Sequence, residues 1–258
     1  MSKTENKSLT IAIVNQKGGV GKSTTAVNLS ACLADNGKKV LLVDLDPQAN
    51  TTSGIGQRQD RQKCVYNVLI DNEPIDSIIE TTNVENLMLV PSSIQLAGAE
   101  IEMVSRFSRE ARLRMAFEKV SQEYDYIMID CPPSLGLLTV NALTAADKLI
   151  IPIQCEYYAL EGLSQLIESV KLVKKHLNTK LEIAGVVMTM FDVRTKLSSQ
   201  VTSEVIKHFS NKVYQTVIPR SVRLSEAPSY GLPIITYDVK SKGAQAYKSF
   251  AKEVIARG

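Results

Sequence analysis

One short segment limits the possible folds of this chain more than any other. It reads VNQKGGVGKSTT, from Val14 to Thr25, and it follows an apolar stretch that begins at Leu9 and precedes a helix-like stretch. Three glycines leave the backbone bare, and Lys17 and Lys22 add positive charge. Backbone N–H groups in a glycine loop that opens a helix can approach phosphate oxygens closely. The segment therefore predicts a phosphate-binding loop between a strand and a helix.

The loop is a variant of the P-loop pattern, in which a glycine and four further residues precede Gly-Lys-Ser/Thr. Gln16 stands where that first glycine is expected. We expect Lys22 to reach the β- and γ-phosphates, Ser23 to bind Mg²⁺ and Thr24 to contact the α-phosphate. The predicted phosphate-binding residues are Lys17, Gly18, Gly19, Val20, Gly21, Lys22, Ser23 and Thr24. The alternative, a glycine-rich turn with solvated lysines, does not explain the strand–loop–helix context, and the dinucleotide pattern G-x-G-x-x-G is missing from this loop.

Acidic residues follow two other apolar stretches. Asp44 and Asp46 lie in LLVDLDPQAN, and Asp130 lies in YDYIMIDCPPS. Ligands of open α/β sheets collect at the carboxyl ends of the strands. We expect Asp130 to join the Mg²⁺ shell through water. Asp46 has a less definite role, as a helix cap or a support of the loop, and an ordinary strand-end cap is the alternative for either strand-end aspartate taken alone.

The apolar stretches are continuous rather than alternating, which is typical of parallel strands covered on both faces. Helix-like segments separate them. We therefore predict an α/β fold with a doubly wound, mostly parallel sheet and helices on both faces. No structure is predicted for residues 53–85. The expected strands are residues 9–15, 39–46, 86–92, 126–133, 148–154, 182–192 and 213–219.

Length and composition fit one domain. The chain has 258 residues, of which 44% are hydrophobic, and we expect a single domain over residues 9–258 after a flexible tail, residues 1–8. The four cysteines are scattered, which indicates reduced thiols in a cytoplasmic protein. The first residues, MSKTENKS, have no apolar core typical of a signal peptide, and no apolar run approaches the ~18 residues of a membrane span.

The segment K-G-G-V-G-K-S-T resembles the deviant Walker A motif of the ParA/MinD ATPases, which are P-loop NTPases. Further segments resemble the ParA/Soj chromosome-partitioning branch, namely LLVDLDPQANTTSG, QLAGAEIE, IMIDCPPSLGLLTVNAL, QCEYYALEGLSQL and TVIPRSVRLSEAPSYGLPI. Ser23 replaces the commoner Thr, and Tyr230 stands where many relatives have His. The first strand is expected near residue 9, which leaves no room for the N-terminal helix-turn-helix of the larger plasmid proteins.

The resemblance implies a Mg²⁺-dependent ATPase that forms a homodimer in the ATP state. It implies that Lys17 reaches the phosphates of the partner's nucleotide and that Asp44 positions the attacking water, so the predicted catalytic residues are Lys17, Lys22 and Asp44. The base is expected near the ends of two later strands. The candidate base-binding residues are Met190, Phe191, Pro219 and Arg220; for Met190 and Phe191, simple core packing is the alternative.

The resemblance further implies sequence-nonspecific binding of double-stranded DNA by the dimer, release stimulated by a ParB-type protein, and location on the nucleoid in the cytoplasm. The charge distribution agrees, because residues 188–258 hold eleven Lys or Arg and five Asp or Glu, although the whole chain has a net charge of only +3. Arg194, Arg220 and Arg223 are the first candidates for phosphate contact. Solvated surface residues are the alternative for each of them.

Three other functions stay open at this point. A MinD-like membrane-associated positioning ATPase would need an exposed amphipathic C-terminal helix, but GAQAYKSFAKEVIARG fits a helix packed on the core better. We expect no membrane partner. An iron–sulfur ATPase of the nitrogenase-reductase type is suggested by Cys131 after Asp130, but the cysteines do not follow its pattern. A regulatory switch whose hydrolysis times binding to other proteins is compatible with the sequence.

Overall fold

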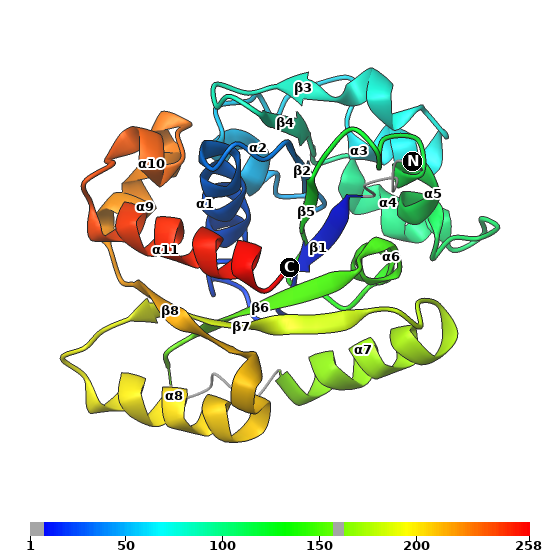
Figure 1. The fold of residues 1–258 in the computed structure, drawn as a ribbon. Coiled ribbons are helices and arrows are strands. Elements are labelled where there is room, and N and C mark those ends of the chain that lie inside the picture. The colour runs from blue at the N-terminus through cyan, green and yellow to red at the C-terminus, as the bar shows by residue number, and fades with distance from the viewer. Residues whose placement is uncertain (1–7, 157–162) are drawn as a thin grey trace, which may run out of the picture.

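The computed structural model of the chain describes residues 8–156 and 163–258. Within these residues one eight-stranded sheet forms the centre of the molecule (Figure 1). Its strands are β1 (Leu9–Ile13), β2 (Val40–Asp44), β3 (Glu80–Thr81), β4 (Leu87–Val90), β5 (Tyr126–Asp130), β6 (Lys148–Gln154), β7 (Glu182–Phe191) and β8 (Val213–Pro219). Their spatial order is β3-β4-β2-β5-β1-β6-β7-β8. Only β3 runs antiparallel to its neighbour among the pairings of this sheet.

Helices cover both faces of the sheet. One face carries α1 (Lys22–Asp35), α9 (Val222–Glu226), α10 (Ile234–Tyr237) and α11 (Lys242–Ala256). The other face carries α3 (Val65–Ile70), α4 (Leu96–Met103), α5 (Arg112–Phe117), α6 (Leu137–Ala145), α7 (Leu163–His176) and α8 (Lys196–Phe209). The short elements are α2 (Asn50–Gly54), η1 (Ile75–Ile78), η2 (Ser210–Lys212) and η3 (Ala227–Tyr230).

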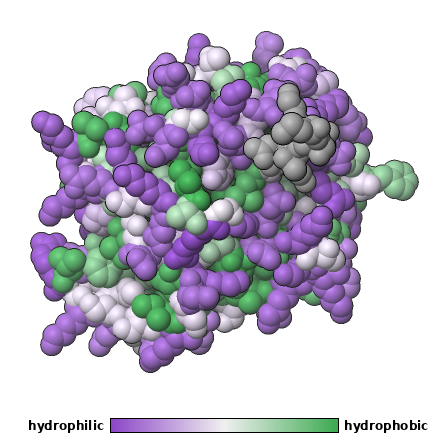
Figure 2. Space-filling model, viewed as in Figure 1, coloured by the Kyte–Doolittle hydropathy of each residue, from purple (hydrophilic) through white to green (hydrophobic). Residues whose placement is uncertain are grey.

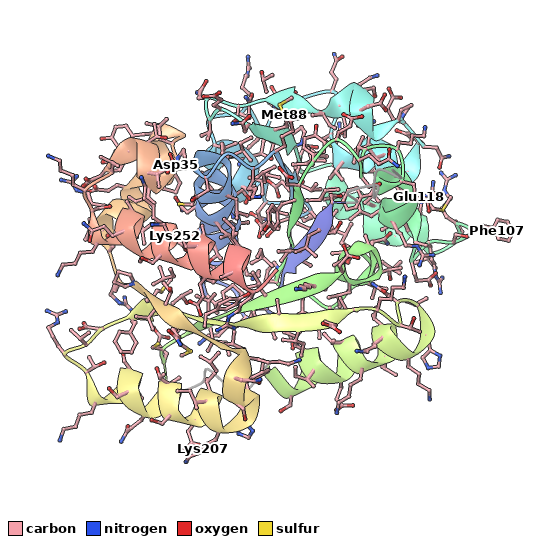
Figure 3. The ribbon with its side chains drawn as sticks, in the orientation of Figure 1. Asp35, Met88, Phe107, Glu118, Lys207 and Lys252 are labelled. Carbon is pink, nitrogen blue, oxygen red and sulfur yellow. The ribbon has the colours of Figure 1, made fainter. Side chains whose placement is uncertain are left out.

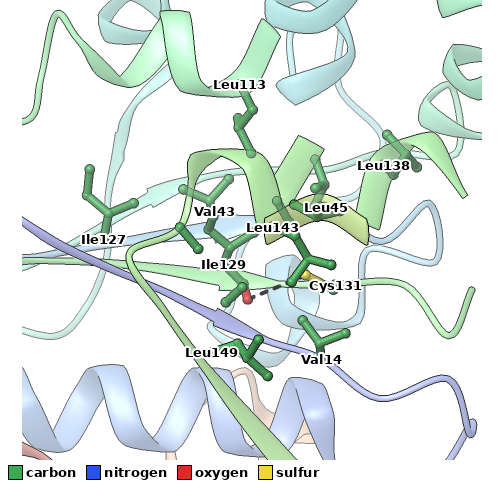
Figure 4. Packing of buried hydrophobic residues seen from close by; sticks show 14 of the residues in the cluster. Val14, Val43, Leu45, Leu113, Ile127, Ile129, Cys131, Leu138, Leu143 and Leu149 are labelled. Atoms are coloured by element: carbon green, nitrogen blue, oxygen red, sulfur yellow. Dashed lines mark hydrogen bonds between the residues drawn. The ribbon is translucent and has the colours of Figure 1, made fainter. Parts of the chain in front are cut away.

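The continuous apolar character of the strands follows from these two layers. Successive side chains of a strand point to opposite faces. Along β2, Leu41 and Val43 join one core, whereas Val40 and Leu42 join the other. Figure 4 shows the first core, where Val43, Ile129 and Leu149 lie near Leu143 of α6. The predicted fold class, a doubly wound and mostly parallel α/β sheet, is confirmed.

The helices fit their sequence signals. Gly21 precedes α1 with a φ of 87°, and Gly37, with a φ of 76°, follows its end as expected for a helix stop. Ser241 accepts a hydrogen bond from the backbone N–H of Ala244 and so caps α11. Residues 53–85, for which the sequence predicted no structure, hold the end of α2, then α3, η1 and β3.

The C-terminal helix is packed as the sequence indicated. Tyr247 and Phe250 of α11 are buried, and the Tyr247 hydroxyl lies 3.2 Å from that of Thr25 in α1. In the parts of the chain that the structure describes, no helix combines the length and hydropathy that crossing a membrane requires. The face shown in Figure 2 is mostly hydrophilic, with separate hydrophobic patches.

Residue 8, expected at the end of the tail, packs against the rest of the chain. Ser8 is buried and its backbone N–H donates to the carbonyl of Ser121 at 2.7 Å, so residue 8 belongs to the domain rather than to the tail. The remainder of the expected tail, residues 1–7, lies outside the described residues, as does the part of QCEYYALEGLSQL at 157–162.

Candidate active site

The glycine loop starts where the central strand β1 ends, between β5 and β6. Asn15 fixes its first residues. The Asn15 side-chain amide donates to the carbonyl of Pro152 at 2.7 Å, and its Oδ1 accepts from the backbone N–H of Lys17 at 2.9 Å. These bonds tie the loop to the neighbouring strand β6, so the loop has a defined position before any ligand binds.

The glycines of the loop supply bare backbone. Gly19 and Gly21 have φ values of 74° and 87°, in the left-handed region where glycine is favoured. A Cβ atom built on Gly18 or Gly19 would meet nothing within 4 Å, so that space is open for a ligand. At the end of the loop the Thr189 hydroxyl of β7 donates to the Val20 carbonyl at 2.8 Å.

Lys22 is placed inside this loop. Lys22 is only 6% exposed, and its Nζ donates a hydrogen bond to the carbonyl of Lys17 at 3.0 Å. Burial lowers the pKa of Lys22, while the carboxylates of Asp130 and Asp46 act in the opposite direction. A buried cation surrounded by open backbone N–H groups is suited to a bound phosphate.

Asp44 and Asp130 are opposite residues of the adjacent strands β2 and β5, so both lie at the carboxyl edge of the sheet. Asp44 is fully buried, and both of its carboxylate oxygens accept hydrogen bonds from the protein. Its Oδ2 accepts from the backbone N–H and the hydroxyl of Thr52, each at 2.7 Å, and its Oδ1 accepts from the backbone N–H of Asp46 at 3.1 Å. Burial and then the neighbouring Asp130 raise the pKa of Asp44.

Asp130 keeps one oxygen available. Its Oδ2 accepts from the Thr51 hydroxyl at 2.7 Å, whereas its buried Oδ1 has no hydrogen-bond partner within the described residues. Burial raises the pKa of Asp130, and the hydroxyls of Ser23 and Thr51 lower it. A buried, unpartnered carboxylate oxygen near a serine hydroxyl fits a Mg²⁺ shell. No group of three metal-ligating side chains occurs among the described residues, so phosphate and water oxygens would complete that shell.

A cavity of about 420 Å³ lies at the glycine loop and is lined by Lys22 and Ser23, while the buried Asp130 lies outside its lining. Asp46 lines it, but Asp44 does not. This geometry does not support the expected role of Asp44 in positioning water, because Asp44 has no exposed surface and both of its oxygens are bonded within the protein. The lining includes Gly18, Gly19, Gly21, Lys22, Ser23, Thr24, Asp46, Gln48, Asn50, Pro133, Met190 and Pro228.

Lys17 differs from Lys22 in its surroundings. Its side chain is 38% exposed and does not line the cavity. Its Nζ lies 3.8 Å from Oε2 of Glu156, and Arg220 lies 3.5 Å from the other oxygen of Glu156. Lys17 therefore has the freedom to reach something outside its own chain's cavity.

The four expected base-binding residues do not come together. Met190, which has a φ of 50°, lines the cavity of the glycine loop. Phe191, Pro219 and Arg220 instead line a separate cavity of about 900 Å³. Met190 has a left-handed φ, and the pairing of β7 with β8 is irregular between Met188 and Phe191, so the regular alternation of the strand is interrupted there and the two residues face different cavities.

The three expected DNA-binding arginines are exposed but paired. Arg194 binds Asp192, Arg220 approaches Glu156, and Arg223 binds Glu226 at 3.0 Å and lies 3.5 Å from Asp238. Arg194 and Arg220 line the same 900 Å³ cavity, together with Lys242, whereas Arg223 lies outside it on α9.

Several site residues were not predicted from the sequence. Thr51 and Thr52 hold the two strand-end carboxylates, and Asn15 and Thr189 hold the loop. The hydroxyls of Thr51 and Thr52 directly follow DPQAN, and that proximity was the available signal. The role of Thr189 depends on strands far apart in the sequence and had no local signal.

The fold and this site define a P-loop ATPase: a parallel sheet, a glycine loop before a buried lysine, and aspartates at the carboxyl edge. A family model described as an AAA domain matches residues 8–183. The chain is 64% identical over 249 residues to the "Sporulation initiation inhibitor protein Soj" of Bacillus subtilis, covering 96% of this chain and 98% of that protein. It is 52% identical to the "Chromosome-partitioning ATPase Soj" of Treponema pallidum, covering 96% and 97%.

A solved structure from Mycobacterium smegmatis, described as cobyrinic acid a,c-diamide synthase with bound ATP analogue and magnesium, matches with a TM-score of 0.84. It is 37% identical, and the match covers 95% of this chain and 93% of that one. The chain belongs to the ParA/Soj family of chromosome-partitioning ATPases.

Proposed function

We propose that this chain is an ATP-driven switch for DNA segregation. It binds ATP with Mg²⁺, pairs with a second copy, binds double-stranded DNA on the nucleoid without sequence preference, and leaves the DNA after hydrolysis that a ParB-type protein stimulates. The observation that carries the proposal is the contrast between its two loop lysines: Lys22 is buried in the cavity, whereas Lys17 is half-exposed outside it.

The phosphates of ATP bind the open backbone of Gly18 and Gly19 and the Nζ of Lys22. Ser23 and the unpartnered oxygen of Asp130 hold Mg²⁺, directly or through water. When bound, the ion offsets the charge of the phosphates. The base lies toward Met190 and Pro228, which line the same cavity.

Asp46 orients the attacking water, since its carboxylate belongs to the cavity wall and has one bonded oxygen, which accepts from the backbone N–H of Gln48 at 2.9 Å. We expect Asp46→Ala to keep ATP binding and to lower hydrolysis about 100-fold or more. We expect Asp44→Asn to keep most of the hydrolysis. Phosphate release and titration with a fluorescent ATP analogue measure both effects. The opposite ranking of the two variants would restore Asp44 as the water-positioning residue.

Lys17 acts on the nucleotide of the partner copy, as cations supplied by a second molecule do in other nucleotide hydrolases. We expect Lys17→Ala to bind ATP but to stay monomeric, and Lys22→Ala to bind no ATP. Light scattering during size-exclusion chromatography with a non-hydrolysable analogue measures the mass. Lys39→Ala is the control, because Lys39 is exposed at the opposite end of β2. A Lys17→Ala dimer with full ATPase activity would exclude the role.

DNA phosphates contact the surface formed by Arg194, Arg220 and Lys242, with Arg223 as an additional contact. The test is binding to a random-sequence duplex without nucleotide, with ADP and with a non-hydrolysable ATP analogue. We expect tight binding only with the analogue. Equal affinity in all three conditions would contradict a DNA-binding switch controlled by ATP.

The MinD-like alternative has less support. A membrane-binding helix presents its apolar face to the lipid, but Ala244, Tyr247, Phe250 and Val254 of α11 are buried against the rest of the chain.

A further inference from the structure

Helix α4 and the segments on either side of it carry exposed apolar residues that the proposed function does not use. Ile94 lies in the turn before the helix, Ile101 lies within it, and Val104 caps its C-terminal end. They are 71%, 80% and 58% exposed, and Phe107, three residues further on, is 97% exposed. Figure 3 shows Phe107 projecting from the body of the molecule. Single exposed apolar residues are ordinary, but a contiguous patch of them indicates an interaction site.

A cavity of about 200 Å³ lies beside Phe107. Val68 and Ile75 of α3 and η1 form one wall. The other wall comes from α5 and the turn after it, where residues three, four and seven positions apart share one face. The residues of this second wall are Arg112, Met115, Ala116 and Lys119. The cavity therefore has an apolar floor and a cationic rim.

The cations at this rim are Arg112 and Lys119, and Arg106 lies outside the lining. Within the described residues, Arg106, Arg112 and Lys119 form no ion pair. The one acidic residue of the lining, Glu73, forms an ion pair with Lys63 at 2.5 Å.

Arg112 is the most constrained of these cations. Its Nε is buried without a hydrogen-bond partner among the described residues, although its terminal nitrogen donates to Asn72. Burial and the like charge of Arg106 lower the pKa of Arg112. Buried donors are normally paired, so this guanidinium has capacity for an anion.

We propose that Phe107 and the adjacent cavity form a docking site for an acidic peptide segment of a partner protein, with one large apolar side chain of the peptide seated in the cavity. A carboxylate of that segment binds Arg112 and the neighbouring Arg106, because guanidinium groups bind carboxylates in a two-pronged geometry. The cavity is smaller than the ~300–1,000 Å³ usual for small-molecule sites and suits a single side chain. Its apolar floor offers no hydrogen-bond donor to a DNA phosphate, and its concave lining does not match a flat lipid surface.

The test uses the full chain and a display library of random twelve-residue peptides. We expect the selected peptides to contain Asp or Glu next to Leu, Phe or Trp. Synthetic copies of them are expected to bind at least about tenfold more weakly to Phe107→Ser and to Arg112→Glu, as loss of an anchor residue predicts. Arg114→Glu is the matched control, because it makes the same charge change on α5 outside the cavity lining.

The same variants distinguish the other possible occupants. None of the exchanged residues lines the ATP cavity, so basal ATP hydrolysis is expected to stay unchanged. Phe107→Ser removes no buried packing, and an unchanged melting temperature verifies the fold. Selected peptides that are neutral or basic, or that bind both variants and the control equally, would overturn the proposal. So would an effect of Arg112→Glu on binding to duplex DNA, to phosphatidylglycerol vesicles or to a second copy in place of peptide binding.

Discussion

At the scale of single residues, Asp44 and Asp46 show how far a motif can be interpreted. The sequence places both at the carboxyl end of β2, and the structure agrees. The sequence does not determine which of the two aspartates faces the ligand, because that depends on how the following loop folds. Thr52 returns to the strand end and covers Asp44, which leaves Asp46 on the cavity wall.

The burial of Asp44 has a consequence for stability. Burial and the adjacent Asp130 raise the pKa of Asp44 from 3.8 to about 8. The folded chain then binds a proton that the unfolded chain has lost, so this group stabilises the fold fully below pH 4 and its contribution is lost as the pH rises toward 8. We expect Asp44→Asn to flatten the fall in unfolding free energy between pH 5 and pH 8, measured with urea in the absence of nucleotide.

The matched control for this measurement is Asp60→Asn, because Asp60 is exposed. We expect its pH profile to follow that of the unmodified chain. A parallel shift of the Asp44→Asn profile, with an unchanged slope, would show that Asp44 is ionised in the folded state.

At the scale of elements, the strands and the glycine loop were predictable because their signals are local: continuous apolar runs, and glycines before a helix. The short elements α2, α3, η1 and β3 were not, because tertiary bonds define them. The Cys64 thiol before α3, for example, lies 3.1 Å from the Ser93 hydroxyl, 29 residues away in the sequence. Met190 and Phe191, expected together at the base, line different cavities because β7 is irregular between Met188 and Phe191, a feature with no local signal in the sequence.

Helix α11 provides a test of how strongly one element is fixed to the core. Phe250 is fully buried and packs edge-on against Tyr214, with ring centroids 4.8 Å apart. We expect Phe250→Ala to cost about 3–5 kcal/mol of unfolding free energy. Lys252→Ala, an exposed position on the same helix that Figure 3 labels, is the control and is expected to change stability by less than about 0.5 kcal/mol. Urea unfolding measures both, and a small cost for Phe250→Ala would mean that α11 is only loosely attached.

At the scale of the whole molecule, the sequence predicted how many basic residues the C-terminal third carries, but not which of them lie together on the surface. The sequence identified the basic excess of the last third. The sequence could not show that Arg194, Arg220 and Lys242 share one cavity, since Arg194 follows β7, Arg220 follows β8 and Lys242 begins α11.

This clustering leads to a salt-dependence prediction. The proposed dimer would carry six of these cations, and six phosphate contacts predict a loss of DNA affinity of about 10³-fold between 50 and 200 mM salt. We expect Lys242→Ala to reduce the slope of log affinity against log salt by about 1.8, because it removes two contacts from each dimer. Fluorescence anisotropy with a labelled duplex measures the slope. An unchanged slope would place the DNA on another surface.

The side-by-side position of Asp44 and Asp130 also makes the nucleotide-free protein less stable to unfolding than the nucleotide-bound protein. Two buried acids share this edge of the sheet, and Asp130 opposes the ionisation of Asp44. Occupation of the pocket by a metal–nucleotide pair relieves this repulsion and favours the folded state by mass action. The melting temperature of the chain is therefore expected to rise with the fraction of sites that hold nucleotide. In a cell, the lifetime of the folded protein then depends on the supply of nucleotide.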